Sequence, residues 1–149
     1  MISELLTYGW PGQQWCLRDG DYNTLDWREV NTRPKPALEE ILALGTAYVA
    51  AKARKLALEA ELQRGHRVEP EGFTLSFSPE TRASLAQMLA LLQEGRSLGM
   101  IKDDGLQTIS DVDGQVHTLS TLRLRQIMVG YGMRYKELWD EGRDDGRYL

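Results

Sequence analysis

The side chains that could do chemistry are few and lie far apart in the sequence. His66 and His117 stand in different segments, and neither has a second His, Cys or acidic residue at a metal-ligand spacing. Cys16 lies between Trp15 and Leu17 in a strand-like run, without a nearby base or basic cluster that would activate a thiol. We therefore expect both histidines to be exposed or hydrogen-bonded structural residues, and Cys16 to be buried packing.

Two short motifs resemble functional loops but lack the residues that would complete them. The Asp-Val-Asp-Gly motif at residues 111–114 has the start of a calcium loop, yet Leu122 stands where such a loop needs a bidentate Glu. The Gly-Tyr-Gly motif at residues 130–132 lacks the third glycine and the preceding strand of a dinucleotide site. The sequence thus predicts a turn at the first motif and close helix packing at the second.

Acidic and aromatic residues do not form a catalytic pattern either. Asp103 and Asp104 are adjacent on a turn, with no apolar pocket to separate their pKa values for acid–base catalysis. Trp10, Trp15 and Tyr22 could stack on sugar rings if exposed, although packing inside the protein is the default for such rings. We therefore predict no catalytic, cofactor-binding or metal-binding residues, no cofactor, and a protein that is not an enzyme.

The composition indicates a folded protein with a slightly acidic balance. Of 149 residues, 42% are hydrophobic and 27% are charged, which argues against disorder. A net charge of -4 disfavours nucleic acid as a partner. No apolar run reaches the roughly 20 residues that span a bilayer, residues 1–4 do not begin a secretion signal, and one cysteine fits a reducing compartment. Glu59 and Glu61 interrupt the one cluster of basic residues, which contains Lys52, Arg54, Lys55, Arg64 and Arg67.

The first of three predicted segments, residues 1–33, is rich in aromatic residues. Residues 2–8 favour a short helix that Gly9 and Pro11 would end. Residues 14–18 and 22–29 favour strands, and the Asp-Gly-Asp turn at residues 19–21 would join them into a β-hairpin. Because an isolated hairpin is marginal in water, we expect its rings to pack on the neighbouring helix or on another subunit.

The second segment, residues 34–65, predicts one long central helix. Pro36 can open it, residues 37–64 are mostly strong helix formers, and Gly65 supplies the stop. Two apolar rows run along this helix, so it should touch neighbours on two sides. Its small seam residues leave two readings open, a helix packed by its own chain and an intersubunit bundle resembling a coiled coil. The first row is Leu42, Val49 and Leu56 with Thr46, Ala53 and Ala60, and the second is Leu44, Tyr48, Ala51, Leu58 and Leu62.

The third segment, residues 66–149, is predicted to be an α+β domain. After a polar stretch at 65–72, residues 73–77 alternate as a strand, and Ser78 and Pro79 open a helix whose buried stripe includes Leu85 and Leu92. Residues 106–109 and 115–119 should complete a small antiparallel sheet of two or three strands with residues 73–77. Together with the other segments, this predicts a mainly helical α+β fold.

A last helix should run from the cap residue Ser120 to about residue 141. The charges at its ends oppose the helix dipole, with Arg123 and Arg125 near the start and Asp140 near the stop. We expect the polar tail at residues 142–149 to be mobile unless docked. The residues predicted on the buried face of this helix are Leu124, Ile127, Met128, Tyr131, Tyr135 and Leu138.

Two parts of the chain resemble proteins of tailed bacteriophages. Residues 8–18, 21–27 and 33–36 resemble a segment, followed by a Lys-Pro start to an acidic helix, in short proteins encoded among tail-fibre and baseplate genes. Residues 72–76, 78–92 and 119–135 resemble a domain of unknown function at the ends of phage tail-fibre-type proteins. No functional residues come with either resemblance.

The resemblance implies a structural component of a bacteriophage tail, in a fibre or beside a baseplate. Such a virion protein would be synthesised in the host cytoplasm and would act as a homo-oligomer, for example a trimer, among other tail proteins. The alternatives are a tail-fibre assembly chaperone and a receptor- or glycan-binding tail module. Nucleic acid and membrane are not expected as partners.

Overall fold

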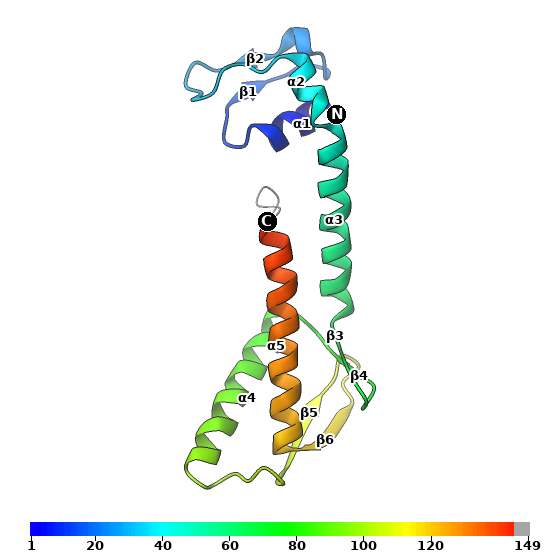
Figure 1. Cartoon of the computed structure of the whole chain (residues 1–149), viewed down its shortest axis with the longest axis vertical. Coiled ribbons are helices and arrows are strands. Elements are labelled where there is room, and N and C mark those ends of the chain that lie inside the picture. Colours follow the sequence, from blue (N-terminus) through cyan, green and yellow to red (C-terminus); the bar gives the residue numbers. More distant parts are fainter. Residues whose placement is uncertain (145–149) are drawn as a thin grey trace. The chain divides into compact units, whose positions relative to one another are not determined.

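The computed structural model describes residues 1–144 and confirms a mainly helical α+β fold (Figure 1). The chain divides into two compact units, unit 1 (Met1–Leu56) and unit 2 (Ala57–Asp144), so the predicted segment 34–65 is shared between them. Unit 1 contains α1 (Ile2–Gly9), β1 (Trp15–Cys16), the 3-10 helix η1 (Tyr22–Thr24), β2 (Asp26–Trp27), α2 (Leu38–Ala43) and the first part of α3 (Gly45–Arg64). Unit 2 contains the rest of α3, β3 (His66–Val68), β4 (Phe73–Leu75), α4 (Pro79–Ser97), β5 (Leu106–Ser110), β6 (Val116–Ser120) and α5 (Thr121–Asp144).

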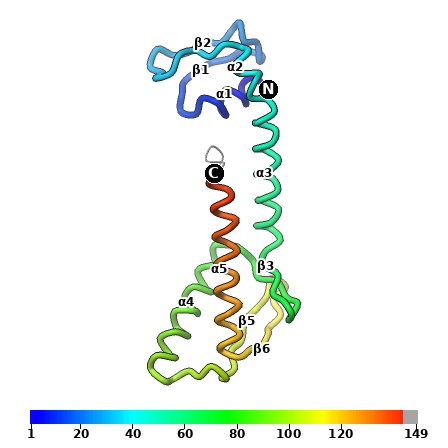
Figure 2. Tube along the Cα trace, in the orientation of Figure 1, coloured from blue at the N-terminus to red at the C-terminus, as the bar shows by residue number. Residues whose placement is uncertain are grey.

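Unit 1 begins with the predicted short helix and strand pair. Figure 2 follows the chain from α1 through β1 and β2 to α2. The strands pair antiparallel, Trp15 with Trp27 and Cys16 with Asp26, but each is only two residues long. The prediction of a strand at residues 22–29 is wrong in its first part, because Asp21 caps the 3-10 helix by accepting a hydrogen bond from the Asn23 backbone N–H.

The aromatic rings of unit 1 pack within the unit, as one of the two sequence alternatives expected. Trp10 is buried, and Trp15, Tyr22 and Trp27 are half-buried against the same core. The fully buried side chains at its centre come from α1 and α2, which places the hairpin region on these two helices. They are Leu5, Leu6 and Ile41.

The prediction of one continuous helix over residues 37–64 is wrong at Leu44. The Leu44 N–H bonds the Ile41 carbonyl at 3.2 Å, a 3-10 spacing that separates α2 from α3. A Cβ on Gly9 would stand 2.3 Å from the Cδ1 atom of Leu44, so the Leu44 side chain packs directly against Gly9 of α1 and would have to shift for any larger residue there. Gly45, a poor helix former, follows at once. The break therefore coincides with a packing contact on α1 and with a residue of low helix propensity.

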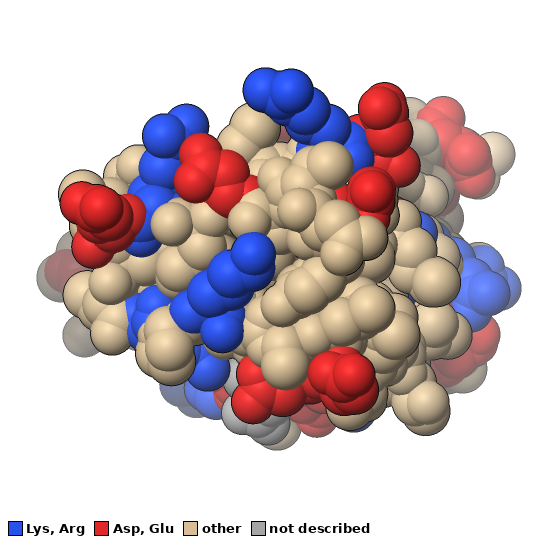
Figure 3. All heavy atoms as spheres, turned by 90° about the horizontal axis from the view of Figure 1, so that it is seen from above, with Lys and Arg blue, Asp and Glu red and all other residues tan. Residues whose placement is uncertain are grey.

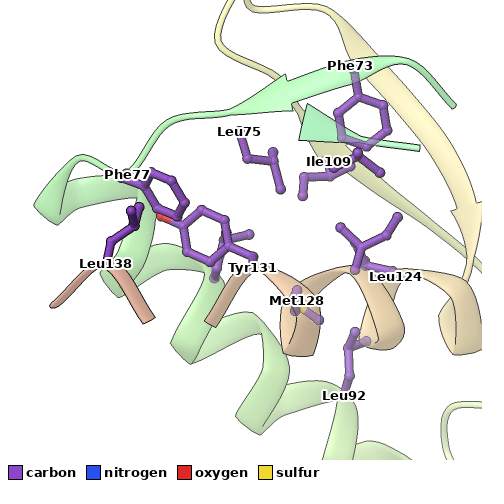
Figure 4. Close-up of a cluster of buried hydrophobic side chains, with 12 residues drawn as sticks. Phe73, Leu75, Phe77, Leu92, Ile109, Leu124, Met128, Tyr131 and Leu138 are labelled. Atoms are coloured by element: carbon purple, nitrogen blue, oxygen red, sulfur yellow. The ribbon is translucent and has the colours of Figure 1, made fainter. Parts of the chain in front are cut away.

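Unit 2 has the larger core, formed by the inner faces of α4, α5 and the hairpins (Figure 4). The predicted stripe on α4 is confirmed at Leu85 and Leu92, and the predicted face of α5 is confirmed, with Tyr135 partly buried. Tyr131 of α5 lies beside Phe77, with ring centres 5.0 Å apart, and its hydroxyl donates a hydrogen bond to the Ser76 carbonyl at 2.7 Å. Burial raises the pKa of Tyr131 to about 12, so this hydroxyl stays a donor at neutral pH.

The strands of unit 2 form two separate hairpins rather than the single sheet predicted. β4 pairs with β3, a strand that the sequence analysis assigned to a polar stretch, and β5 pairs with β6. One backbone hydrogen bond of 2.9 Å, from the Val112 N–H to the Thr74 carbonyl, links the hairpins. Residues 73–75 thus pair with the strand that directly precedes them in the sequence, β3, and not with β5 or β6.

The predicted start of each long helix in unit 2 is confirmed. The Ser78 hydroxyl accepts from the Thr81 N–H at 3.2 Å with Pro79 following, and the Ser120 hydroxyl accepts from the Arg123 N–H at 3.2 Å. α5 continues to Asp144, three residues beyond the predicted end. Residues 145–149 of the predicted tail lie outside the described residues.

The basic charge at the start of α5 is explained by its partners in the β3–β4 loop. Arg123 donates two hydrogen bonds to the Glu71 carboxylate, at 2.5 and 2.8 Å, and one to the Glu69 carbonyl at 2.6 Å. The hydrogen bond from Arg123 lowers the pKa of Glu71 to about 2. A bidentate pair of this kind offsets the unfavourable position of a cation at a helix start and fastens the loop to α5.

We expect Arg123→Met to destabilise unit 2 by about 1 kcal/mol at pH 7, because a two-pronged but partly exposed ion pair is lost. The folded-state pKa of Glu71 lies below its ordinary value of 4.5, so the pair's contribution is complete above pH 4.5 and lost as pH falls towards 2. Urea denaturation of the full chain between pH 7 and 2 measures this loss.

The matched control is Arg67→Met, which removes a 3.0 Å pair with Glu69 in which both side chains are more than half exposed. This variant should keep the stability and the acid sensitivity of the wild type. An Arg123→Met protein with unchanged acid sensitivity would contradict the assignment of the pair.

Candidate interaction surface

The most prominent uncovered feature of unit 1 is the first of the two predicted apolar rows. Its large members are exposed at the surface of α2 and α3, and Val49 in the middle of the row is 65% exposed. Thr46 and Ala53, the small residues between them, are exposed too. We call these five residues the α3 row, which consists of Leu42, Thr46, Val49, Ala53 and Leu56.

The second predicted row, except its last residue, packs inside the protein. Ala51 is buried, Leu44 and Tyr48 lie half-buried against the core of unit 1, and Leu58 packs on the core of unit 2. Leu62, at the end of that row, is exposed. The chain therefore supplies neighbours for one side of the helix and leaves the α3 row without a cover among residues 1–144.

A shallow groove of about 750 Å³ lies along the α3 row from Leu42 to Ala53. It joins Leu42 of α2 with Thr46 and Val49 of α3, so the break at Leu44 does not interrupt the apolar surface. Small residues are among those that line it, so little side-chain bulk would keep another backbone away. Those residues are Gly45, Ala50 and Ala53, and the exposed Met1 borders them.

Charges stand at one rim of the groove. The terminal ammonium of Met1 lies 3.4 Å from the Glu4 carboxylate and, as its hydrogen-bond donor, lowers the pKa of Glu4. Lys52 places its ammonium 5.9 Å from the centre of the Tyr48 ring. The surface thus has an apolar centre with charged groups of both signs at one edge. Sequence reasoning identified the row but missed Met1, whose place follows from the fold of α1.

A second, smaller groove of about 320 Å³ lies between α4 and α5 in unit 2. The expectation that Gly130 and Gly132 permit close helix packing is wrong, because a Cβ at either position would have no atom within 4 Å among the described residues. Gly132 instead opens this groove beside Tyr135, whose ring is covered by the Arg82 guanidinium at 4.3 Å.

The residues first considered for chemistry have structural surroundings. His117 bonds the Asp111 carboxylate at 2.7 Å and stacks on Phe73 with ring centres 4.1 Å apart, and the 111–114 motif forms the predicted turn. The His66 ring meets Tyr131 edge-on, and burial followed by the charge of Arg134 lowers the pKa of His66.

Cys16 is exposed, so the prediction of a buried cysteine is wrong. Side chains alternate across a strand, and the side of β1 that faces the core is taken by the half-buried Trp15. The thiol of the next residue therefore points away from the core. Exposure alone gives it no base or partner that would make it a nucleophile.

Residues 1–144 contain no group of three His, Cys, Asp or Glu side chains that could hold a metal ion. None of the helices described is both long and apolar enough to cross a bilayer. Figure 3 shows one face on which Lys and Arg side chains are interspersed with Asp and Glu, unlike the continuous basic surface that nucleic acid requires.

No family model, no curated protein and no solved structure matches this chain.

Proposed function

We propose that this protein is a structural component of a bacteriophage tail, in a fibre or beside a baseplate, that acts through oligomeric assembly. The observation that carries this proposal is the α3 row, in which Leu42, Val49 and Leu56 recur every seven residues and remain exposed. A seven-residue repeat of apolar side chains lets identical helices supercoil around one another with those side chains in the seam. The resemblance of the two chain halves to tail-associated proteins supplies the biological setting.

The groove favours a second copy of the chain as the partner. Repeats of equal length match one another in register, so the α3 row of one copy fits the α3 row of the next. The small residues Ala50 and Ala53 beside Val49 shorten the distance at which two helices pack. A trimer or another closed homo-oligomer would bury the row from every subunit.

We expect the purified protein to be a homo-oligomer at micromolar concentration, and Val49→Glu to weaken association at least tenfold. Each subunit would bring a carboxylate into the apolar seam, and only about 1.4 kcal/mol of lost binding free energy is needed for a tenfold change. Light scattering coupled to size exclusion, at several concentrations, measures the mass. Circular dichroism should stay unchanged, because Val49 is largely exposed in the single chain.

The matched control is Ala47→Glu, which adds the same charge to an exposed position of α3 outside the groove. It should associate like the wild type. A wild-type protein that remains a monomer at every concentration, or equal association of the two variants, would sink the proposal of assembly through the α3 row.

A tail-fibre assembly chaperone, the alternative function, could use the same surface. A different measurement distinguishes it from a structural component. A structural component is retained in purified particles in stoichiometric amount, whereas a chaperone leaves before the particle is complete. Quantitative mass spectrometry of purified virions therefore decides between them.

A further inference from the structure

Unit 1 has a second concave feature, a depression of about 510 Å³ away from the α3 row. Its volume falls within the range of ordinary small-molecule sites. It lies between the end of α1, the loop that follows, β1, and the residue after β2. The residues that line it and carry polar or aromatic groups are Thr7, Trp10, Gln13, Gln14, Trp15 and Arg28.

Hydrogen bonds to the segment after β2 fix the wall of this depression. The Gln14 N–H donates to the Asn31 side-chain oxygen at 2.6 Å, and the Asn31 amide donates back to the Gln14 carbonyl at 2.7 Å. The Gln13 side chain accepts from the Arg33 N–H at 3.2 Å and donates to the Thr32 hydroxyl at 3.3 Å. Because these bonds already order the loop, a ligand need not supply that ordering free energy.

Trp15 provides the aromatic surface. It is half-buried, and its indole N–H makes no hydrogen bond to any other residue in the range 1–144. The neighbouring Trp10 is buried, with the Arg33 guanidinium 5.6 Å from its ring centre. Tyr22, the third ring considered from sequence for sugar stacking, is occupied, since its hydroxyl donates to Pro36 and Lys35 covers its face.

The polar groups beside Trp15 are of the kind that bind hydroxyls. Gln14 is exposed, and its side-chain amide has no hydrogen-bond partner among the described residues, so it can both donate and accept. Arg28 adds further N–H donors, while Asp26 at 3.4 Å balances its charge. The site is therefore polar but nearly neutral, which disfavours an anionic ligand.

We infer that this depression binds a neutral pyranose residue of an oligosaccharide. The C–H face of the sugar packs on the electron-rich face of the Trp15 ring, and its hydroxyls exchange hydrogen bonds with the Gln14 amide and the Arg28 guanidinium. This inference goes beyond assembly and does not depend on it, because the depression lies within one unit of one chain.

The test is a glycan array of neutral hexose and N-acetylhexosamine oligosaccharides, followed by titration of the best soluble oligosaccharide under saturation-transfer NMR. The full-length protein should bind at least one of them. In a folded Trp15→Ala variant binding should fall at least tenfold, because the stacking surface is gone. Gln14→Ala keeps the backbone bonds to Asn31 and should weaken binding at least threefold.

The matched control is Trp139→Ala, which removes an exposed tryptophan from unit 2 and should bind as the wild type does. The Val49→Glu variant should also bind in the NMR titration, which separates this inference from self-association. Absence of binding to every oligosaccharide on the array would overturn the inference. So would titrations in which neither Gln14→Ala nor folded Trp15→Ala differs from the wild type.

Discussion

Leu124→Ala is expected to destabilise unit 2 by about 2–5 kcal/mol, the range for removing a leucine side chain from a closely packed core. Leu124 is 0% exposed and lies on the inner face of α5, where its side chain faces the hairpins (Figure 4). Truncation loses the transfer free energy of the removed methyl groups and leaves a cavity that α5 cannot close without moving. A loss of that size approaches the whole stability of a small domain.

Leu122→Ala is the matched control, because Leu122 lies two residues earlier on the same helix and is 45% exposed. Its change in unfolding free energy should stay within about 0.5 kcal/mol. Urea denaturation of the full chain, followed by circular dichroism of the helices, measures both variants. Equal destabilisation of the two variants would show that the inner face of α5 is wrongly assigned.

Features that depend on a few neighbouring residues could be predicted from the sequence. The Ser78 cap needs only its own hydroxyl, the Thr81 N–H three residues later and the intervening Pro79, so the start of α4 is encoded locally. The β5–β6 hairpin likewise follows from a turn that Asp111 stabilises with its carboxylate. The buried faces of α4 and α5 follow from helical periodicity.

Features that depend on distant contacts could not be predicted. At the break, the Leu44 side chain packs on Gly9, which is 35 residues earlier, and no propensity scale contains that contact. β3 was missed because His66 and Arg67 do not have the apolar alternation of a strand, and pairing with β4 makes it one. The exposure of Cys16, in contrast, follows from alternation once Trp15 is placed on the core side.

The candidate interaction surface could be predicted from the sequence only in part. Periodicity revealed two apolar rows on the same helix, but it could not tell which row the chain itself would cover. That depends on how the rest of the chain folds: Leu44 and Tyr48 of the second row pack against the core of unit 1, and Leu58 packs against the core of unit 2. The two alternatives therefore apply to different faces of the helix. The second predicted row is packed by the chain itself, and packing of the α3 row by other subunits is our proposal.

Ile41→Ala should destabilise unit 1 whereas Leu42→Ala should weaken association, although the two residues are adjacent on α2. Ile41 is 0% exposed in the core of unit 1, so its truncation should cost about 2–4 kcal/mol. The described part of unit 1 comprises 56 residues, and a domain of about this size has an expected stability of about 3–8 kcal/mol. The Ile41→Ala protein should therefore lose most of the stability of unit 1 at 25 °C.

Leu42 is 48% exposed and belongs to the α3 row, so Leu42→Ala should leave the single chain folded and weaken association instead. Three of the four tryptophans lie in unit 1, which makes their fluorescence in urea a measure of that unit, while light scattering measures the mass. A variant with a folding defect should show a lower unfolding free energy of unit 1, and the mass of its oligomer should fall as a consequence. A variant with an assembly defect should show a lower oligomer mass, while the diluted monomer unfolds at the same urea concentration as the wild type. If Leu42→Ala unfolds like Ile41→Ala, or assembles like the wild type, the outer face of α2 is not part of the seam.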